Sequence, residues 1–283
     1  MVRKHPLSRL WVWQSCLLAV ALLLSGCRLS PVPQTRGFGL VIPVYNDAGL
    51  SHAVTTLEPH LRDDDRFMIV SGNSTGEVDP AFINRAALAL RTAYPNTPIY
   101  AATSGLSNVV RAARQVGPTV AAVVYIYEPN FPNQPEFSWD FGTTLEQFRE
   151  VKTRSGDRKI IGKPTGRPLL QPSLQDYGWD YGELATTVDE LFIQTQTYCK
   201  EGSAAFGEAV DEVIAQYGVR VNVLPWVPQI TVDPDAPNGT GVAQAQACVA
   251  EAQQRGVSGV VLWWSPEFVG RAVSFIAALN AGR

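Results

Sequence analysis

The chain has 283 residues, with 23 Lys and Arg against 26 Asp and Glu, and a formal net charge of −3 at pH 7. No basic cluster or stripe occurs along it, which argues against nucleic acid as a partner. The length suits one large domain with a single hydrophobic core, preceded by a short N-terminal segment of different composition.

The first 27 residues are predicted to be an export signal rather than part of a fold. Arg3, Lys4 and Arg9 form a basic start, and the apolar stretch that follows is too short to span a membrane comfortably. Next comes Leu24-Ser25-Gly26-Cys27, which resembles the lipobox of bacterial lipoproteins. The resemblance implies cleavage before Cys27 and a lipidated cysteine that attaches the exported protein to a membrane of the cell envelope. An uncleaved signal anchor is the alternative.

Residues 28–36 are predicted to form a short tether, because they show no apolar period. Removal of the signal leaves 20 basic and 26 acidic residues, so the mature net charge is −6. No second apolar span follows, and lipid is therefore the only membrane anchor that we expect.

From residue 37 to residue 283 the chain repeats one pattern: a short β-rich run, a loop rich in Gly, Pro and Asn, and an amphipathic helix. This alternation is typical of βαβ units and a parallel sheet. Eight such units in about 250 residues predict a (β/α)8 TIM barrel, with an open doubly wound sheet as the alternative. The predicted strands are Gly39–Tyr45, Arg66–Ser71, Pro98–Ala102, Val120–Tyr127, Lys159–Lys163, Glu190–Gln196, Val219–Val227 and Val257–Trp264.

The fourth predicted strand, Val120–Tyr127, is a continuous apolar run that stops at Glu128 followed by Pro129. Such a run is what a parallel strand buried on both faces requires. Proline cannot donate to the ladder, so the strand should end near Glu128 and leave its carboxylate at the rim. Barrel enzymes place catalytic groups at this end of their strands. The alternative is that Glu128 pairs with a nearby Lys or Arg or binds loop amides.

The other strand ends are expected to present mainly aromatic and amide side chains at the same rim. Flat aromatic faces cover the apolar face of a sugar ring, while amides and tyrosines bond its hydroxyls, which fits the general form of a small-molecule site. The alternative is that the tryptophans belong to the barrel core and its cap. The candidate substrate-binding residues are Tyr45, Asn73, Tyr127, Asn130, Lys163, Gln196, Trp226 and Trp263.

Two short motifs resemble glycoside hydrolases of the large barrel clan whose fourth strand ends Asn-Glu-Pro. They are Tyr127-Glu128-Pro129 and the last strand ending Val-Leu-Trp263-Trp264. The opening run from Gly39 to Tyr45 is similar to the start of spherulin-4-type polysaccharide hydrolases. The resemblance implies a carbohydrate substrate, with Glu128 as the general acid/base.

This chain departs from the family pattern at three points. Tyr127 stands where the family has asparagine, and the predicted seventh strand and its end, through Gln229, contain no acid to serve as the nucleophile. The chitinase-type Asp-x-Glu ending is also absent, because Ile126 stands two residues before Glu128. Glycoside hydrolysis normally requires two carboxylates.

Three residues are candidates for the second carboxylate: Glu267 first, then Asp47 and Asp180. Each has a structural alternative. Asp180 has Glu183 three residues on, as in a capping box, and Glu267 follows Ser265-Pro266 as in a first helical turn. Asp47 lies beside Asn46 and Gly49, as a turn residue does.

Other chemistries have weaker support. The run Gly72–Gly76 matches the Gly-x-Ser-x-Gly pattern of serine hydrolases, but no histidine follows it as that fold requires. His52 and His60 lack partners for a zinc site, and no dinucleotide or P-loop pattern occurs, so no metal and no cofactor are expected. Asn238-Gly239-Thr240 is interpreted as a turn. Cys199 and Cys248 remain as one pair that forms either a disulfide or two buried thiols.

We therefore predict an exported, lipid-anchored glycoside hydrolase that acts on an oligo- or polysaccharide. A non-catalytic carbohydrate-binding lipoprotein on the same barrel is the alternative. A third reading is a small-molecule lyase or hydrolase that uses Glu128 with Lys163 or Arg167.

Overall fold

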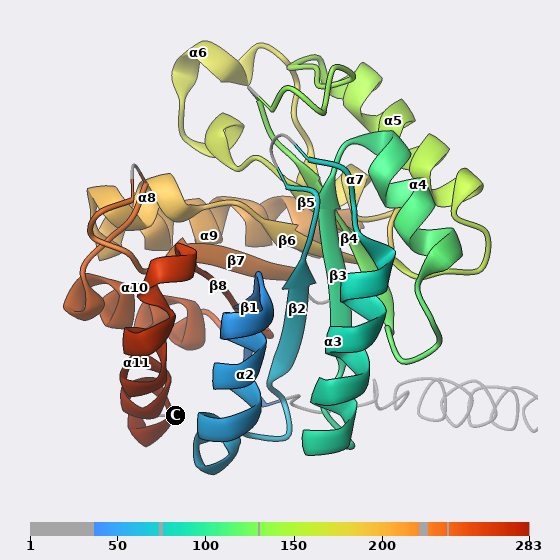
Figure 1. Ribbon diagram of the computed structural model, residues 1–283. Coiled ribbons are helices and arrows are strands. Elements are labelled where there is room, and N and C mark those ends of the chain that lie inside the picture. Colours follow the sequence, from blue (N-terminus) through green and yellow to red (C-terminus); the bar gives the residue numbers. More distant parts are fainter. Residues whose placement is uncertain (1–36, 74–75, 130, 221–225, 237, 283) are drawn as a thin grey trace, which may run out of the picture. The chain divides into compact units, whose positions relative to one another are not determined.

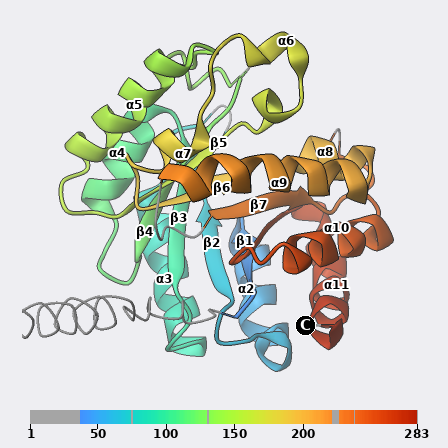
Figure 2. The same ribbon diagram turned by 180° about the vertical axis from the view of Figure 1, so that it is seen from behind.

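The computed structural model describes residues 37–282, except for 74–75, 130, 221–225 and 237. Eight parallel strands follow one another in chain order and close into a barrel, as Figures 1 and 2 show. Pairing of β1 with β8, with Gly39 opposite Gly259, closes the ring. The predicted (β/α)8 TIM barrel is confirmed. The strands are β1 (Gly39–Val44), β2 (Arg66–Val70), β3 (Ile99–Ser104), β4 (Ala122–Tyr127), β5 (Ile160–Pro164), β6 (Glu190–Ile193), β7 (Trp226–Thr231) and β8 (Gly259–Trp263).

Helices surround the barrel and connect its strands (Figure 1). They are α2 (Asp47–Thr56), α3 (Pro80–Ala93), α4 (Leu106–Gln115), α5 (Phe141–Arg154), α6 (Pro172–Gln175), α7 (Tyr181–Leu184), α8 (Gln196–Glu201), α9 (Ser203–Arg220), α10 (Val242–Gln254) and α11 (Val269–Gly282), with 3-10 turns η1 (Glu58–His60), η2 (Arg167–Leu169) and η3 (Pro266–Phe268). Aspartates cap α3, α5 and α7, because Asp79, Asp140 and Asp180 each accept a hydrogen bond from a backbone N–H of the first turn.

Alternation along each strand decides which side chains enter the barrel. Tyr125 and Tyr127 on β4 pack against Phe148 of α5, with ring centroids 5.0 and 5.3 Å apart. They therefore face the helical layer, and their neighbour Ile126 faces the interior. The register pairs Ile126 with Lys163 on β5, so Lys163 also points inward. The strand ending at Tyr127 thus aims the next side chain, Glu128, at the barrel mouth.

The predicted bounds of the seventh strand were wrong by several residues. Helix α9 continues to Arg220, and β7 begins only at Trp226 and ends at Thr231. The β-branched residues near Val219 suggested a strand, but Val219 itself belongs to the last turn of a long helix. The residues that follow the true strand end are therefore Val232 and Asp233 rather than Pro228 and Gln229.

The predicted signal peptide, lipobox and tether occupy residues 1–36 and lie outside the described residues. Among the helices that the structure describes, none combines the length and the apolar character needed to cross a membrane.

A disulfide joins Cys199 of α8 to Cys248 of α10, two residues 49 positions apart in the sequence. Both cysteines are fully buried, and the disulfide alternative is the one that the structure contains. Because α8 begins at Gln196, the bond ties the segment after β6 to the helical layer.

Replacing both Cys199 and Cys248 by alanine should lower the free energy of unfolding by about 4 kcal/mol, because the unfolded chain regains the freedom of a long closed loop. Urea unfolding measures this change. Each single alanine variant should lose nearly as much as the double variant, since either change breaks the bond. A single variant as stable as the unsubstituted protein would contradict the disulfide.

Candidate functional site

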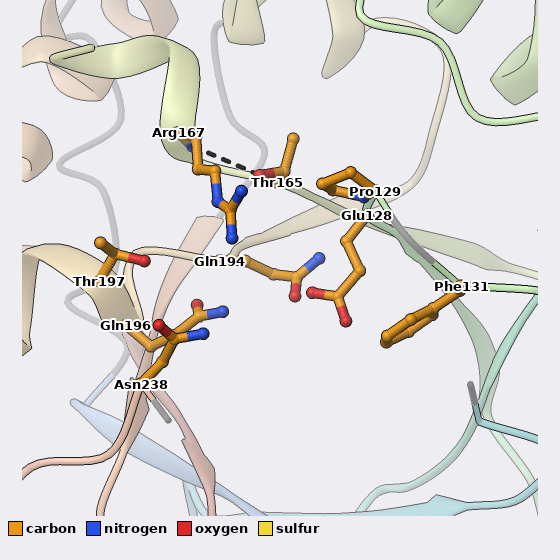
Figure 3. Close-up of a pocket in the computed structure, with 9 residues that line it drawn as sticks. All are labelled: Glu128, Pro129, Phe131, Thr165, Arg167, Gln194, Gln196, Thr197 and Asn238. Carbon is orange, nitrogen blue, oxygen red and sulfur yellow. Dashed lines mark hydrogen bonds between the residues drawn. The ribbon is translucent and has the colours of Figure 1, made fainter. Parts of the chain in front are cut away.

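A pocket of about 160 Å³ lies at the barrel mouth, among the segments that follow β4, β5, β6 and β7 (Figure 3). Barrel enzymes build their sites from these same C-terminal strand ends. The lining contains a carboxylate, a guanidinium, three amides, two hydroxyls and a phenyl ring. The residues are Glu128, Pro129, Phe131, Thr165, Arg167, Gln194, Gln196, Thr197 and Asn238.

The backbone at Glu128 is held by one side chain from the loop that follows it. The amide of Gln134 donates to the carbonyl of Ile126 at 2.9 Å, and its oxygen accepts the N–H of Glu128 at 3.1 Å. Gln134 therefore takes the place of a strand partner where the pairing of β4 with β3 ends at Ile126. Glu128 points from this fixed position into the pocket, as Figure 3 shows.

The rest of the β4–α5 loop is fixed to neighbouring strands. The Asn133 amide donates to the carbonyl of Gly72 at 2.9 Å, and its oxygen accepts the Ser104 hydroxyl at 3.1 Å. Gly105 has φ +82°, and a Cβ there would lie 2.3 Å from the Asn133 carbonyl oxygen. Only glycine fits this close approach. The loop that presents Glu128 and Phe131 is thus built onto β2 and β3.

Glu128 and Lys163 titrate as neighbours in a poorly solvated environment. Burial raises the pKa of Glu128, and the positive charges of Lys163 and Arg167 oppose that rise. Burial lowers the pKa of Lys163 to about 8, against the favourable charge of Glu128. Neither cation makes a direct ion pair with the carboxylate among the described residues. The site therefore holds a carboxyl group that is protonated more readily than usual, beside a lysine that loses its proton more readily than usual.

Three of the predicted binding residues meet inside the barrel. The Lys163 ammonium lies 3.9 Å from the ring centroid of Trp263, and the Tyr45 ring meets that indole edge-on at 5.3 Å. Burial raises the pKa of Tyr45, and the charge of Asp233 adds to the rise, while the N–H of Trp264 opposes it. None of the three residues belongs to the lining of the pocket. They form the aromatic support for the buried lysine.

Several buried polar atoms without protein partners lie on segments that lead to the barrel mouth. Within the described residues they include Asn73 Oδ1 after β2, Gln229 Oε1 on β7 and Gln196 Oε1 at the start of α8. Buried acceptors in folded proteins are nearly always hydrogen-bonded, so each requires a donor. The predicted binding residues Asn73 and Gln196 both have this unmet requirement, and Gln196 lines the pocket.

Two predicted binding residues, Tyr127 and Trp226, lie away from both the pocket and the cluster around Lys163. Tyr127 points outward, and its hydroxyl accepts the N–H of Ser138 at 2.8 Å. Trp226 begins β7 opposite Leu191, near the start of β6, and thus lies at the opposite end of the barrel. The prediction for Trp226 failed because the seventh strand was placed too early, and that for Tyr127 because alternation turns it away from Glu128. Asn130 lies outside the described residues.

None of the three proposed second carboxylates lines the pocket. Asp47 is exposed in an ion pair with Arg85 at 3.2 Å, and Asp180 caps α7 as its structural alternative predicted. Glu267 is exposed within η3. The described residues also contain no cluster of His, Cys, Asp and Glu that could hold a metal ion.

Sequence reasoning missed Asp233, which follows the end of β7. Asp233 is 2% exposed and accepts hydrogen bonds from the N–H groups of Asp235 at 3.1 Å and Ser265 at 3.2 Å. Burial alone raises its pKa, but the hydrogen bonds from Ser265 and Asp235 and the charge of Arg271 outweigh it and lower the pKa. Asp233 thus remains ionised and fixes the β7 and β8 loops together.

Several residues of the lining were at predicted strand ends, namely Thr165, Arg167 and Gln194. Thr197 and Asn238 were missed. The sequence indicates only a turn at Asn238. With β7 ending at Thr231, Asn238 lies in the loop after that strand, where pocket residues are expected. Phe131, in the loop between β4 and α5, forms a wall of the pocket (Figure 3).

No family model matches the sequence, and a search of curated proteins finds no match. Solved structures are similar to the barrel at low identity. A family 18 chitinase from Crocus vernus has a TM-score of 0.59 at 14% identity, covering 86% of this chain and 98% of that chain. The glycoside hydrolase domain of PgaB (BpsB) from Bordetella bronchiseptica has a TM-score of 0.56 at 10% identity, with the same coverages of 86% and 98%.

A lyase is also similar in structure. The 2,3-dimethylmalate lyase has a TM-score of 0.51 at 17% identity, covering 85% of this chain and 80% of that chain. These similarities show the fold, a (β/α)8 barrel like those of glycoside hydrolases, and do not decide the chemistry. The finer resemblance to the clan with the Asn-Glu-Pro ending stays a prediction.

Substitution of Lys163 by methionine should raise the pKa of Glu128 further, because the lysine charge stabilises the carboxylate. Conversely, Glu128→Gln should lower the pKa of Lys163 below about 8, since the carboxylate stabilises the ammonium. Carbon-13 NMR titration of the Glu128 carboxyl and of the Lys163 side chain measures both shifts. The matched control is Lys159→Met at an exposed position just before β5. An unchanged Glu128 pKa in Lys163→Met would disprove the coupling.

Proposed function

We propose that this protein is a glycoside hydrolase acting on an oligo- or polysaccharide, with Glu128 as the general acid/base. One observation carries the proposal: among the described residues, the pocket at the strand ends is lined by a single carboxyl group, and burial raises its pKa. A general acid must be protonated near the working pH, and burial is how enzymes achieve this for a carboxyl group. The amides and hydroxyls around it match the donors and acceptors of a sugar.

In the proposed reaction, protonated Glu128 donates its proton to the glycosidic oxygen as the bond between that oxygen and the anomeric carbon breaks. The leaving sugar departs as a neutral alcohol, and Glu128 becomes a carboxylate that can remove a proton from the incoming water. The acid step requires the protonated form, so activity should fall as the pH rises through the raised pKa of Glu128.

The positive charge that develops at the anomeric carbon needs a partner, and the part of the lining that the structure describes holds no second carboxylate. A substrate that carries an N-acetyl group can supply its own carbonyl oxygen, as in the substrate-assisted families that include family 18. Family 18 chitinases are among the similar structures. N-acetylated glycans are therefore the first substrate class to test.

The absence of a second carboxylate from the described pocket lining also favours one alternative. A barrel that keeps the polar mouth without the groups for turnover would bind a glycan and leave it intact. This second candidate, a non-catalytic carbohydrate-binding lipoprotein, would bind sugar hydroxyls through the same amides, Gln194, Gln196 and Asn238. It differs from the first only in turnover.

Glu128→Gln should lower kcat on N-acetylglucosamine oligomers by about 100-fold or more, because the amide cannot donate the proton. Product release is measured by mass spectrometry, and binding by calorimetry. The control is Glu146→Gln, at an exposed position on α5. Turnover that survives Glu128→Gln would remove Glu128 from the mechanism. Binding without turnover by the unsubstituted protein, across a panel of glycans, would select the non-catalytic alternative.

We further propose that the protein is exported and held to a membrane by lipid on Cys27. The support is the sequence alone: a basic start, a short apolar core and the lipobox-like Leu24-Ser25-Gly26-Cys27. Anchoring would keep the barrel at the envelope, where polysaccharides are assembled and degraded.

Cys27→Ser should remove the lipid attachment site and move the protein from the membrane fraction to the soluble fraction of the envelope. Cell fractionation, together with metabolic labelling by a fatty acid analogue, measures both effects. Cys16→Ser, within the predicted signal, is the matched control and should leave both unchanged. Labelling that persists in Cys27→Ser would disprove this anchor.

A further inference from the structure

Arg167 differs from the arginines that stabilise the fold. Arg66, Arg85 and Arg111 each form an ion pair with a carboxylate, at 2.8, 3.2 and 2.8 Å respectively. The Arg167 guanidinium has no ion pair and no hydrogen bond in the part of the chain that the structure describes. It is half-buried and points into the pocket beside Gln194 and toward Glu128 (Figure 3).

The backbone that carries Arg167 is nevertheless firmly held. Its N–H donates to the Thr165 hydroxyl at 3.4 Å, and its carbonyl accepts the Tyr198 hydroxyl at 2.7 Å. The same Tyr198 oxygen accepts the N–H of Leu170 at 3.1 Å. The turn η2 is thus fastened to α8, and the guanidinium is presented from a rigid base with its donors unused.

The charges at the site add up to a cationic pocket. Arg167 and Lys163 are the two cations that act on Glu128, and Glu128 is the only carboxylate among the described residues of the lining. Burial favours the neutral form of Glu128, so the negative charge that would balance the two cations is incomplete. This local excess of positive charge contrasts with the net charge of −3 of the whole chain.

The neutral part of the lining suits a sugar ring. Gln194, Gln196, Thr197 and Asn238 supply donors and acceptors, and Gln196 Oε1 is a buried acceptor that lacks a donor. A cavity of about 160 Å³ has room for one small ring rather than a long chain. A guanidinium binds a planar carboxylate through two parallel hydrogen bonds, which a neutral hydroxyl cannot match.

We propose that the sugar unit bound in this pocket carries a carboxylate, and that Arg167 binds that carboxylate as the specificity-determining residue. The inference rests on the proposed carbohydrate site and names its substrate class, an acidic sugar. The carboxylate can belong to the ring, as in a uronic acid, or to an ether substituent, as in muramic acid. Lys163 adds long-range attraction without touching the ligand.

The test measures binding to the Glu128→Gln variant, so that hydrolysis does not enter. Three pairs of ligands are compared by calorimetry or NMR titration: glucuronic acid with glucose, galacturonic acid with galactose, and N-acetylmuramic acid with N-acetylglucosamine. At least one acidic member should bind about tenfold tighter than its neutral partner. The pair that shows the preference identifies ring or ether carboxylate.

Arg167→Gln in the same background should abolish the preference, and Arg167→Lys should restore part of it, because a point charge lacks the paired geometry. The matched control is Arg149→Gln, at an exposed position on α5. The methyl ester of the preferred acid should bind the Arg167-containing protein about tenfold more weakly than the acid, which tests the inference without any variant.

Equal binding of all acidic and neutral partners, or a preference that survives Arg167→Gln, would overturn the inference. Tighter binding of glucose 6-phosphate than of every carboxylated sugar would also overturn it in favour of a phosphate ligand. The proposed hydrolase activity fails independently: an acidic sugar bound through Arg167 without turnover contradicts only the hydrolase. Turnover of neutral glycans without any acidic preference contradicts only this inference.

Discussion

The site depends on a buried lysine that lies against an aromatic ring and near a carboxyl group. Lys163 is 1% exposed, inside a closed ring of strands, and its ammonium lies over Trp263 and near Glu128. Burial lowers the pKa of Lys163 to about 8, and the charge of Glu128 opposes that shift. Glu128 and Lys163 are thus a coupled pair, because burial raises the pKa of Glu128 and the charge of Lys163 opposes that rise.

The surrounding loops can be understood as supports for that pair. Gln134 holds the backbone on both sides of Tyr127, and Tyr198 holds the turn that carries Arg167. The disulfide at Cys199 lies one residue from Tyr198 and fixes the helix on which it stands. Groups that must act on a substrate are most effective when neighbouring contacts hold them in place, and here the contacts come from the β4–α5 loop, α8 and α10.

The sequence predicted the barrel because every strand but one has a clear period and a clear end. Glu128-Pro129 located the site for the same reason, since proline terminates a buried strand in a recognisable way. Tyr127 and Trp226 were misplaced because composition does not show which way a side chain faces or where a β-branched helix end becomes a strand. Asp233 and Asn238 could not be predicted as site residues because β7 was placed too early. Gln134 could not be predicted because its contacts with β4 form only when the loop folds back onto that strand.

The fold alone does not decide which reaction the protein catalyses, and the charged residues at the barrel mouth reduce the number of candidate reactions. A similar barrel serves a lyase as well as chitinases, and a lysine with a pKa of about 8 beside a carboxyl group suits either use. Lys163, however, lies against Trp263 and outside the lining, whereas Glu128 lies within it. A nucleophilic lysine must reach its substrate, while a charge that adjusts a neighbouring acid need not. This placement favours the proposed role of Glu128 as the acid, with Lys163 affecting the pKa of that carboxyl group from outside the pocket lining.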